Sequence, residues 1–233
     1  QPADSGTIEL DGKTVRMRSP ADAIRHGVGM LHQDPLDFPP LRVVDDLLVG
    51  APGRILPKKA EAIAGVSALA DSLGLSIDFR AEVGSMTVGE RQQLELIRLL
   101  WLGARVLILD EPTTGISAAQ RRQLFDTLRR LAGQGMTVLF VSHKLEEVQE
   151  LCTRVAVLRQ GRLVGEALPP FSVDGLVSMM FEREVSPGAR HACSPGKPVL
   201  CLSGLGVEHG RIRFEGLDLE VCARETIGLA GTE

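Results

Sequence analysis

The sequence predicts an α/β fold with a mainly parallel sheet. The main observation is the run Val106–Leu109, four apolar and mostly branched residues that lead directly into Asp110, Glu111 and Pro112. An apolar run without alternation is typical of a strand that is buried on both faces of a parallel sheet. Asp110 and Glu111 then fall at the carboxyl end of that strand, where open α/β sheets bind their ligands.

Composition narrows the possible functions. The 233 residues are 44% hydrophobic and 24% charged, as in ordinary globular domains. The net charge of -4 provides no global basic field for nucleic acid, and 3% aromatic residues without any Tyr provide no stacking platform for single strands. The four cysteines lack zinc-type spacing, and we interpret them as reduced thiols. No apolar run approaches the roughly 20 residues of a membrane span.

The N-terminal stretch predicts a hairpin. Thr7–Leu10 and Lys13–Met17 both alternate, and Asp11-Gly12 between them is a strong hairpin signal. Gly12-Lys13-Thr14 also looks like the end of a P-loop, which requires four residues between its two glycines. Five residues separate Gly6 from Gly12, and no buried strand precedes Gly6, so we favour the hairpin.

The next segments predict a short strand followed by a helical insertion. Ser19 and Pro20 begin a short helix, and the strand Val28–Leu31 leads to Gln33. Residues 41–103 are expected to be mostly helical, because Lys58–Leu73 has helical periodicity. Thr87 and Glu90 then form a capping box for a helix to about Trp101.

Beyond Glu111, strand and helix alternate. Ser117 and Gln120 form another capping box, and the helix that follows leads to Thr137–Val141, which we expect to be a buried strand. That strand ends in Ser142-His143. A further helix and the strand Val155–Leu158 are expected to continue the parallel layout.

The C-terminal part changes in character. Pro, Gly and Ser gather in a predicted linker at residues 186–197. After it come four short predicted strands, at Val199–Leu202, Ile212–Phe214, Leu217–Val221 and Thr226–Ala230.

Each candidate residue also has an ordinary structural explanation. Two acids at a strand end can simply be solvated, Thr87 with Glu90 can be only a helix cap, and His143 can be a surface residue. The chemical alternative is phosphate chemistry. A helix N-terminus binds phosphate, an acid can hold Mg²⁺, and a second acid can orient a water.

Three stretches occur in one order that favours the chemical alternative. They are Met86–Gln93, Val106–Pro112 and Ser142–Glu147. Together they resemble the nucleotide-binding subunits of ABC transporters, over essentially the whole chain. The Thr-Val-Gly-Glu-Arg and Ser-His-Lys-Leu-Glu-Glu forms are similar to the tandem subunits of simple-sugar and nucleoside importers. The resemblance implies an ATPase that uses ATP and Mg²⁺ at the cytoplasmic face of a membrane, as a peripheral subunit.

The resemblance also implies a role for each matching residue. Gln33 would contact Mg²⁺ or the γ-phosphate and relay to the membrane subunit. Asp110 would act on Mg²⁺, Glu111 would position the attacking water, and His143 would contact the γ-phosphate. The signature residues, which would engage ATP bound by a partner domain, are Thr87, Val88, Gly89 and Glu90. One departure is that no Asp follows Glu111 within Thr113–Ser117, where ABC domains commonly carry one.

The resemblance implies that this sequence is a piece of a tandem subunit, cut between two P-loops. Residues 1–185 would be a first ABC domain without its opening strands and P-loop, with a helical subdomain at about 41–103. Residues 198–233 would be the opening strands of a second domain. We therefore expect negligible ATPase activity from this piece alone. We also hypothesise that Thr226–Ala230 pairs near Val106–Leu109.

The expected partners are transmembrane permease subunits, a substrate-binding protein indirectly, and a second ABC domain in head-to-tail pairing. No nucleic acid is expected. One alternative is a soluble ABC ATPase of DNA repair or translation, which the mild acidity and the lack of a basic or long coiled-coil insertion disfavour. Another is a non-catalytic half-domain that only docks a permease, which Glu111 and His143 disfavour for the first site.

Overall fold

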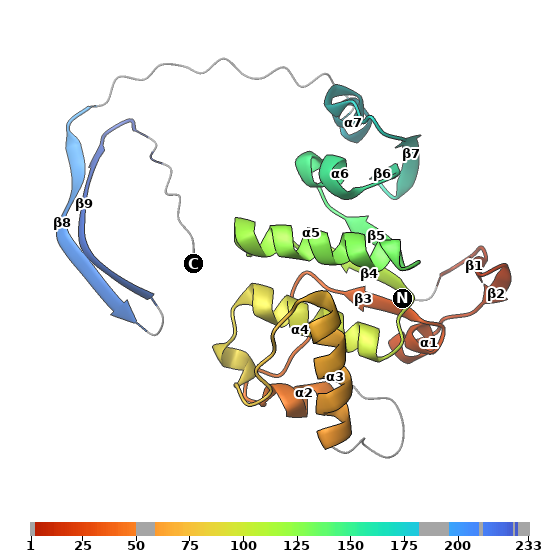
Figure 1. Cartoon of the computed structure of the whole chain (residues 1–233). Coiled ribbons are helices and arrows are strands. Elements are labelled where there is room, and N and C mark those ends of the chain that lie inside the picture. The colour runs from red at the N-terminus through yellow and green to blue at the C-terminus, as the bar shows by residue number, and fades with distance from the viewer. Residues whose placement is uncertain (1–2, 50–58, 182–195, 210–211, 226, 228–233) are drawn as a thin grey trace. The chain divides into compact units, whose positions relative to one another are not determined.

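The computed structural model describes residues 3–49, 59–181, 196–209, 212–225 and 227, in two compact units. The first unit is Gln1–Met180 and the second is Phe181–Glu233. The first holds β1 (Ile8–Leu10), β2 (Lys13–Val15), α1 (Pro20–Arg25), β3 (Val28–Leu31), α2 (Val43–Val49), α3 (Lys59–Leu73), the 3₁₀ turn η1 (Val83–Ser85), α4 (Val88–Trp101), β4 (Val106–Asp110), α5 (Ala118–Gly133), β5 (Thr137–Val141), α6 (Leu145–Leu151), β6 (Val155–Arg159), β7 (Arg162–Ala167) and α7 (Val173–Met180). The second holds β8 (Pro198–His209) and β9 (Ile212–Cys222) (Figure 1).

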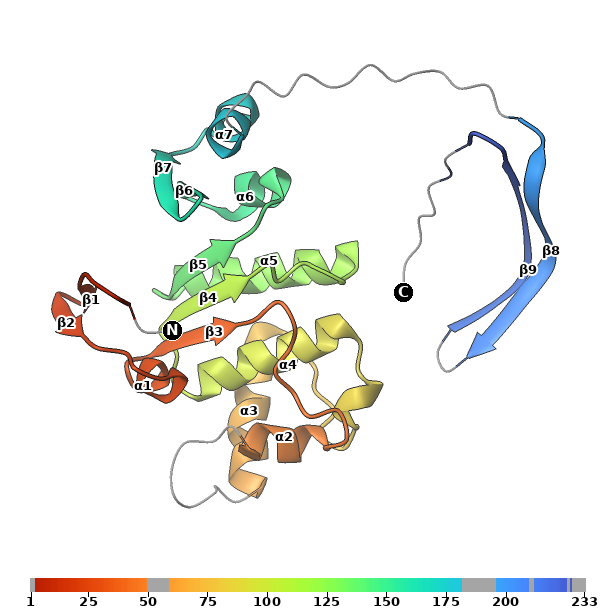
Figure 2. The same ribbon diagram turned by 180° about the vertical axis from the view of Figure 1, so that it is seen from behind.

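A parallel sheet with the order β3-β4-β5 forms the centre of the first unit. Leu31 pairs with Leu109, and Asp110 pairs with Val141, so the carboxyl ends of the three strands lie at one edge. Figure 2 shows the three arrowheads pointing the same way. The parallel α/β prediction is therefore confirmed for these strands.

One face of this sheet is covered by α4 and α5. Leu107 and Leu109 of β4 are fully buried in a cluster that also contains Ile97 of α4 and Phe125 of α5. Phe125 makes an edge-to-face contact with Phe140 of β5, with ring centroids 5.9 Å apart. Burial of each such side chain contributes about 1.5–3 kcal/mol, so this face anchors β4 in the core.

The opposite face of the sheet exposes apolar side chains. Met30, Ile108 and Leu139 lie in one row across the three strands, and Met30 is 38% and Leu139 55% exposed. The expectation that Thr137–Val141 is buried was therefore wrong. β5 alternates between exposed and half-buried residues, because no described element covers this face and β5 is the edge strand of the described sheet.

The strand at Val155–Leu158 does not continue the parallel sheet. The expectation that it would extend the parallel layout was therefore wrong. β6 pairs antiparallel with β7 in a separate two-stranded sheet. The reason is the tight turn at Gln160 and Gly161, whose φ angles of 50° and 74° reverse the chain at once. The next strand is thereby the nearest pairing partner.

The other hairpins follow local signals. Asp11 and Gly12 have φ angles of 50° and 72°, and Ile8 pairs with Val15, so the predicted N-terminal hairpin is confirmed. In the second unit, the three predicted short strands before Thr226 merge into the long pair β8-β9. The pairing register shifts near Gly204, which has a φ of 59°. Lys58, residues 186–195 of the predicted linker, and the strand Thr226–Ala230 apart from Ile227 lie outside the described residues.

The loop after Gln33 is fastened to the helical insertion by buried charges. Glu95 of α4 accepts from the Leu36 amide at 3.2 Å, and Asp46 of α2 accepts from the Phe38 amide at 3.0 Å. Arg98 is ion-paired to Glu95 at 3.1 Å and to Asp46 at 3.7 Å. Two acids thus share one guanidinium below the surface.

Burial raises the pKa of both carboxyl groups, while Arg98 and the backbone amides pull the pKa back down. A raised pKa means that the folded state binds a proton more readily than the unfolded chain. The stabilisation is therefore present below the unfolded pKa and is lost as pH rises through the folded pKa.

The variant Glu95→Gln tests this sign. The amide keeps an acceptor for the Leu36 N–H but has no charge and no proton uptake. We expect the wild type to gain stability relative to Glu95→Gln as pH falls from 7 toward 5, measured by urea unfolding at each pH. A constant difference between the two proteins across this range would contradict the assignment. The exposed substitution Glu61→Gln on α3 is the control.

Candidate functional site

The backbone of Glu111 is held in an uncommon conformation at the end of β4. Its φ is 46°, in the left-handed region that non-glycine residues seldom adopt. Its amide donates to Val141 O at 2.9 Å, and its carbonyl accepts from the Thr114 amide at 3.1 Å. The turn therefore leaves the β4 strand direction immediately after Asp110.

The structure brings Glu111 and His143 together. His143 Nδ1 lies 2.9 Å from Glu111 Oε1, and the two side chains are 63% and 30% exposed. A proton on Nδ1 can be donated to this carboxylate, which leaves Nε2 as the ring atom for a ligand. Half-buried Asp110 immediately precedes this pair.

A buried carboxylate fixes the turn that carries His143. Glu147, only 1% exposed, accepts from Thr113 Oγ1 at 2.8 Å and from Ser142 Oγ at 3.1 Å. Lys144 Nζ lies 3.5 Å from Glu147 Oε1 and donates to Thr113 Oγ1 at 3.1 Å. Because Thr113 follows Glu111 closely, this cluster holds the loop after β4 against the turn after β5.

Sequence reasoning missed the role of Glu147. The residue was part of the quoted Ser142–Glu147 stretch, but a Glu on a short helix normally faces solvent. The one usable signal is its place directly before Val148, which is also buried in α6. The partners Thr113 and Ser142 come from other segments and cannot be inferred from local spacing.

Gln33 lies at the same edge of the sheet. It follows the end of β3 by two residues and is exposed, and the pairing of Leu31 with Leu109 sets the ends of β3 and β4 side by side. Among the described residues no hydrogen bond joins Gln33 to Asp110 or Glu111.

The donor set at this edge fits Mg²⁺. Asp110 supplies a carboxylate and Gln33 an amide oxygen, and Mg²⁺ in phosphate-processing sites takes one or two protein oxygens together with water and phosphate. The described residues contain no cluster of three or more His, Cys, Asp or Glu side chains arranged to hold a metal ion by themselves.

The four signature residues Thr87–Glu90, here called the signature turn, form a complete capping box. Thr87 Oγ1 accepts from the Glu90 amide at 3.3 Å, and Glu90 Oε2 accepts from the Thr87 amide at 2.7 Å. Gly89 is buried beside Gln120, whose amide nitrogen donates to Thr87 Oγ1 at 3.3 Å. The predicted box is confirmed, and the structure joins it to the start of α5.

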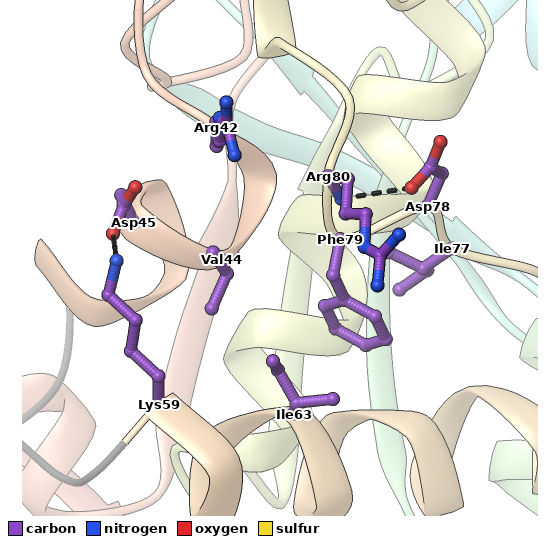
Figure 3. Close-up of a pocket in the computed structure, with 9 residues that line it drawn as sticks. All are labelled: Arg42, Val44, Asp45, Lys59, Ile63, Ile77, Asp78, Phe79 and Arg80. Carbon is purple, nitrogen blue, oxygen red and sulfur yellow. Dashed lines mark hydrogen bonds and ion pairs between the residues drawn. The ribbon is translucent and has the colours of Figure 1, made fainter.

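A cavity of about 590 Å³ lies on the helical insertion (Figure 3). Phe79 and Ile63 approach one another in its wall, and Lys59 is ion-paired to Asp45 at its edge. The amides of Val83 and Gly84 donate to Leu41 O and Pro39 O at 2.9 and 2.8 Å. The loop after Gln33 is thus paired with the segment just before Thr87.

Comparisons with known proteins show which proteins the chain is similar to. The family described as ABC transporter matches residues 1–114. Relatives include "Ribose import ATP-binding protein RbsA 1" of Rubrobacter xylanophilus, 40% identical over 98% of this chain and 46% of its own length. "Glucose import ATP-binding protein TsgD13" of Haloferax volcanii is 33% identical over 98% of this chain and 48% of its own. The chain thus spans about half the length of these curated relatives.

Solved structures show the same fold. A nucleotide-free ATP-binding cassette from an ABC transporter superposes with a TM-score of 0.67 at 21% identity, over 76% of this chain and 75% of its own. The protein cbiO1 of Clostridium perfringens, part of an ABC transporter complex, gives a TM-score of 0.59 at 25% identity. That match covers 71% of this chain and 67% of its own. None of the helices in the described segments is long and apolar enough to cross a membrane. The chain is similar to ATP-binding proteins of ABC transporters, by the family match over residues 1–114 and by relatives that are 40% and 33% identical over 98% of its length.

Proposed function

We propose that this chain is part of an ATP-hydrolysing subunit that powers import of a simple sugar or a nucleoside. The observation that carries the proposal is the Glu111–His143 pair at the carboxyl edge of the parallel sheet, directly beside Asp110. A carboxylate, an imidazole and a second carboxylate at one sheet edge suit phosphoryl transfer, which needs positioning and charge neutralisation more than covalent chemistry.

The residues at this edge have different proposed roles. Glu111 orients the attacking water, and His143 contacts the γ-phosphate through the ring nitrogen that Glu111 leaves free. Asp110 and Gln33 hold Mg²⁺, which neutralises charge on the phosphates when it is bound. The left-handed backbone of Glu111 and the buried Glu147 cluster supply the rigidity that this positioning requires.

The signature turn acts on a second ATP. Thr87, Val88, Gly89 and Glu90 stand at the start of the 14-residue helix α4, whose free amides and dipole favour a phosphate. We propose that this turn engages ATP bound by a second ABC domain in head-to-tail pairing. Nucleotide would close the pair, and hydrolysis would reopen it.

The P-loop, whose backbone amides would bind the phosphates of ATP, is not in this sequence. No segment of the 233 residues has the spacing of a P-loop. Residues 1–185 are proposed to be a first ABC domain and residues 198–233 the opening strands of a second. The exposed face with Met30, Ile108 and Leu139 in one row supports a further helix of the longer protein packing there, because parallel sheets are normally covered on both faces. The 233 residues alone are then expected to hydrolyse no ATP.

Permease subunits are the proposed membrane partners, at the cytoplasmic face, with a substrate-binding protein acting through them. We propose that a cytoplasmic segment of the permease enters the cavity lined by Phe79, Ile63 and Lys59. Support comes from Leu41, which directly precedes the lining residue Arg42 and accepts from the Val83 amide in the segment before Thr87. Through this contact, docking would affect the signature turn.

Our choice of transported substrate is supported by the relatives rather than by the geometry. Both named relatives carry sugar import in their names, one for ribose and one for glucose. A simple sugar is therefore the first choice.

One prediction of the proposed function concerns Glu111→Gln in the chain extended at both ends to include both P-loops. We expect ATP binding to persist and turnover to fall at least about 100-fold, because the amide cannot accept a proton from the attacking water. Steady-state phosphate release with a nucleotide-binding assay measures both. Glu9→Gln, an exposed exchange on β1, is the control. Unchanged turnover in Glu111→Gln would mean that the other ATP site does the work, leaving this edge a structural or regulatory role.

A second prediction concerns the cavity. Arg80 is exposed at its wall, so Arg80→Glu reverses a charge there without altering the core. We expect weaker co-purification with the permease subunits and loss of substrate-stimulated ATPase activity, while basal hydrolysis stays within about twofold. Arg122→Glu, exposed on α5, provides the same charge change elsewhere. Equal behaviour of the two variants would exclude this cavity as the docking surface.

A further inference from the structure

Gln120 belongs to two capping boxes at once. Its Oε1 accepts from the Ser117 amide at 2.9 Å, which closes the box of its own helix α5. Its Nε2 donates to Thr87 Oγ1 at 3.3 Å, in the box of α4. One amide side chain therefore connects the signature turn to the loop that follows Glu111.

The Thr87 hydroxyl is fully engaged by this arrangement. It accepts from the Glu90 amide at 3.3 Å and from Gln120 Nε2 at 3.3 Å, and it donates to Glu90 Oε2 at 3.0 Å. A hydroxyl has one proton and two lone pairs, so all three are in use. The donor at position 120 thus fixes where the hydroxyl proton points.

Close packing fixes the same contact sterically. A Cβ added at Gly89 would lie 2.5 Å from Gln120 Nε2, so only glycine leaves room for the amide. One turn further along, Gln93 Nε2 donates to Gln123 Oε1 at 3.0 Å, so the two helices are joined twice.

We propose that Gln120 is a positioning residue for ATP hydrolysis. It acts through Thr87, and it makes the signature turn and the loop after Glu111 move as one body. The inference rests on the proposed function, because it assigns Gln120 the task of linking the half-site that engages the partner's ATP to the half-site that hydrolyses its own. ATP-driven closure at one site would then move the residues of the other site.

Gln120→Glu isolates this role. The carboxylate keeps the acceptor for the Ser117 amide, and Glu is a preferred residue at this position of a capping box. It loses the donor to Thr87 and adds a second acid that competes with Glu90 for the hydroxyl proton. It also places a negative charge beside the turn that meets a phosphate.

Gln123→Glu is the matched control. It makes the same chemical change one turn along α5, and it keeps Oε1 as the acceptor for Gln93. Charge, size and helix are the same in both variants. Any difference between them therefore reports the contact with Thr87.

Two readouts test the proposal. In the 233-residue chain without nucleotide, amide hydrogen exchange in the first turn of α4 should speed up about tenfold in Gln120→Glu and stay unchanged in Gln123→Glu. In the extended two-domain subunit, the ATP concentration for half-maximal turnover should rise about tenfold in Gln120→Glu. Turnover at saturating ATP should change less than about threefold, because Glu111 and His143 are intact.

The outcomes separate the inference from its premise. Equal exchange rates in the two variants would overturn the positioning role whatever the enzyme does. Faster exchange with an unchanged ATP requirement would overturn the link to ATP. If turnover does not depend on Glu111, the proposed function is wrong. The exchange result would still decide whether Gln120 orders the signature turn. A fall in saturating turnover equal to the rise in half-maximal ATP would mean general damage and would also overturn it.

Gly89→Ala provides a second route that does not add charge. The methyl group would displace the Gln120 amide and cost both of its hydrogen bonds, so first-turn exchange in α4 should again speed up. Gly133→Ala at the end of α5, where a Cβ meets nothing within 4 Å, should leave it unchanged. If Gly89→Ala leaves exchange unchanged, Gln120 does not order the turn.

Discussion

The parallel pairing of β3, β4 and β5 is the constraint on which the site depends. Because the three strands run in one direction and in matched register, Gln33, Asp110 and the Ser142-His143 turn all emerge at one edge. Parallel strands are stabilised by burial, and Leu107 and Leu109 of the apolar run are buried against α4 and α5. Burial on that face fixes β4, and the acids that end it are fixed with it.

Buried carboxylates then hold the loops that leave this edge. Glu147 binds the turn after β5 to the loop after β4, and Glu95 and Asp46 bind the loop after β3 to the helical insertion. Each acid accepts hydrogen bonds from backbone amides or side-chain hydroxyls and lies near a Lys or Arg, which offsets the cost of its burial. The loops at this edge are therefore held by charge and hydrogen bonding, while the strands are held by apolar packing.

Local signals predicted the elements well, and long-range contacts escaped prediction. Thr87 with Glu90, Ser117 with Gln120, and Asp11-Gly12 each act within a few residues, so the helix starts and the turn could be read from the sequence. The exposure of β5 depends on what covers it, and the pairing of β6 depends on which strand is nearest, and neither is encoded in the strand itself. The Glu111–His143, Glu147–Thr113 and Gln120–Thr87 contacts were not predicted, because each joins segments more than 30 residues apart.

The short loop Thr113–Ser117 is where these contacts converge. Thr113 at its start is held by Glu147 and Lys144 against the turn of His143. Ser117 at its end caps α5 through Gln120, which in turn reaches Thr87. A displacement of this loop must stretch hydrogen bonds at both ends, so the position of His143 and the position of the signature turn cannot change independently without breaking one set. The Asp that ABC domains commonly carry in this loop is absent from Thr113–Ser117, and the loop contributes the neutral hydroxyls of Thr113 and Ser117 to these connections. The hydroxyl groups at the two ends of the loop thereby join it to the turn of His143 on one side and to the start of α5 on the other.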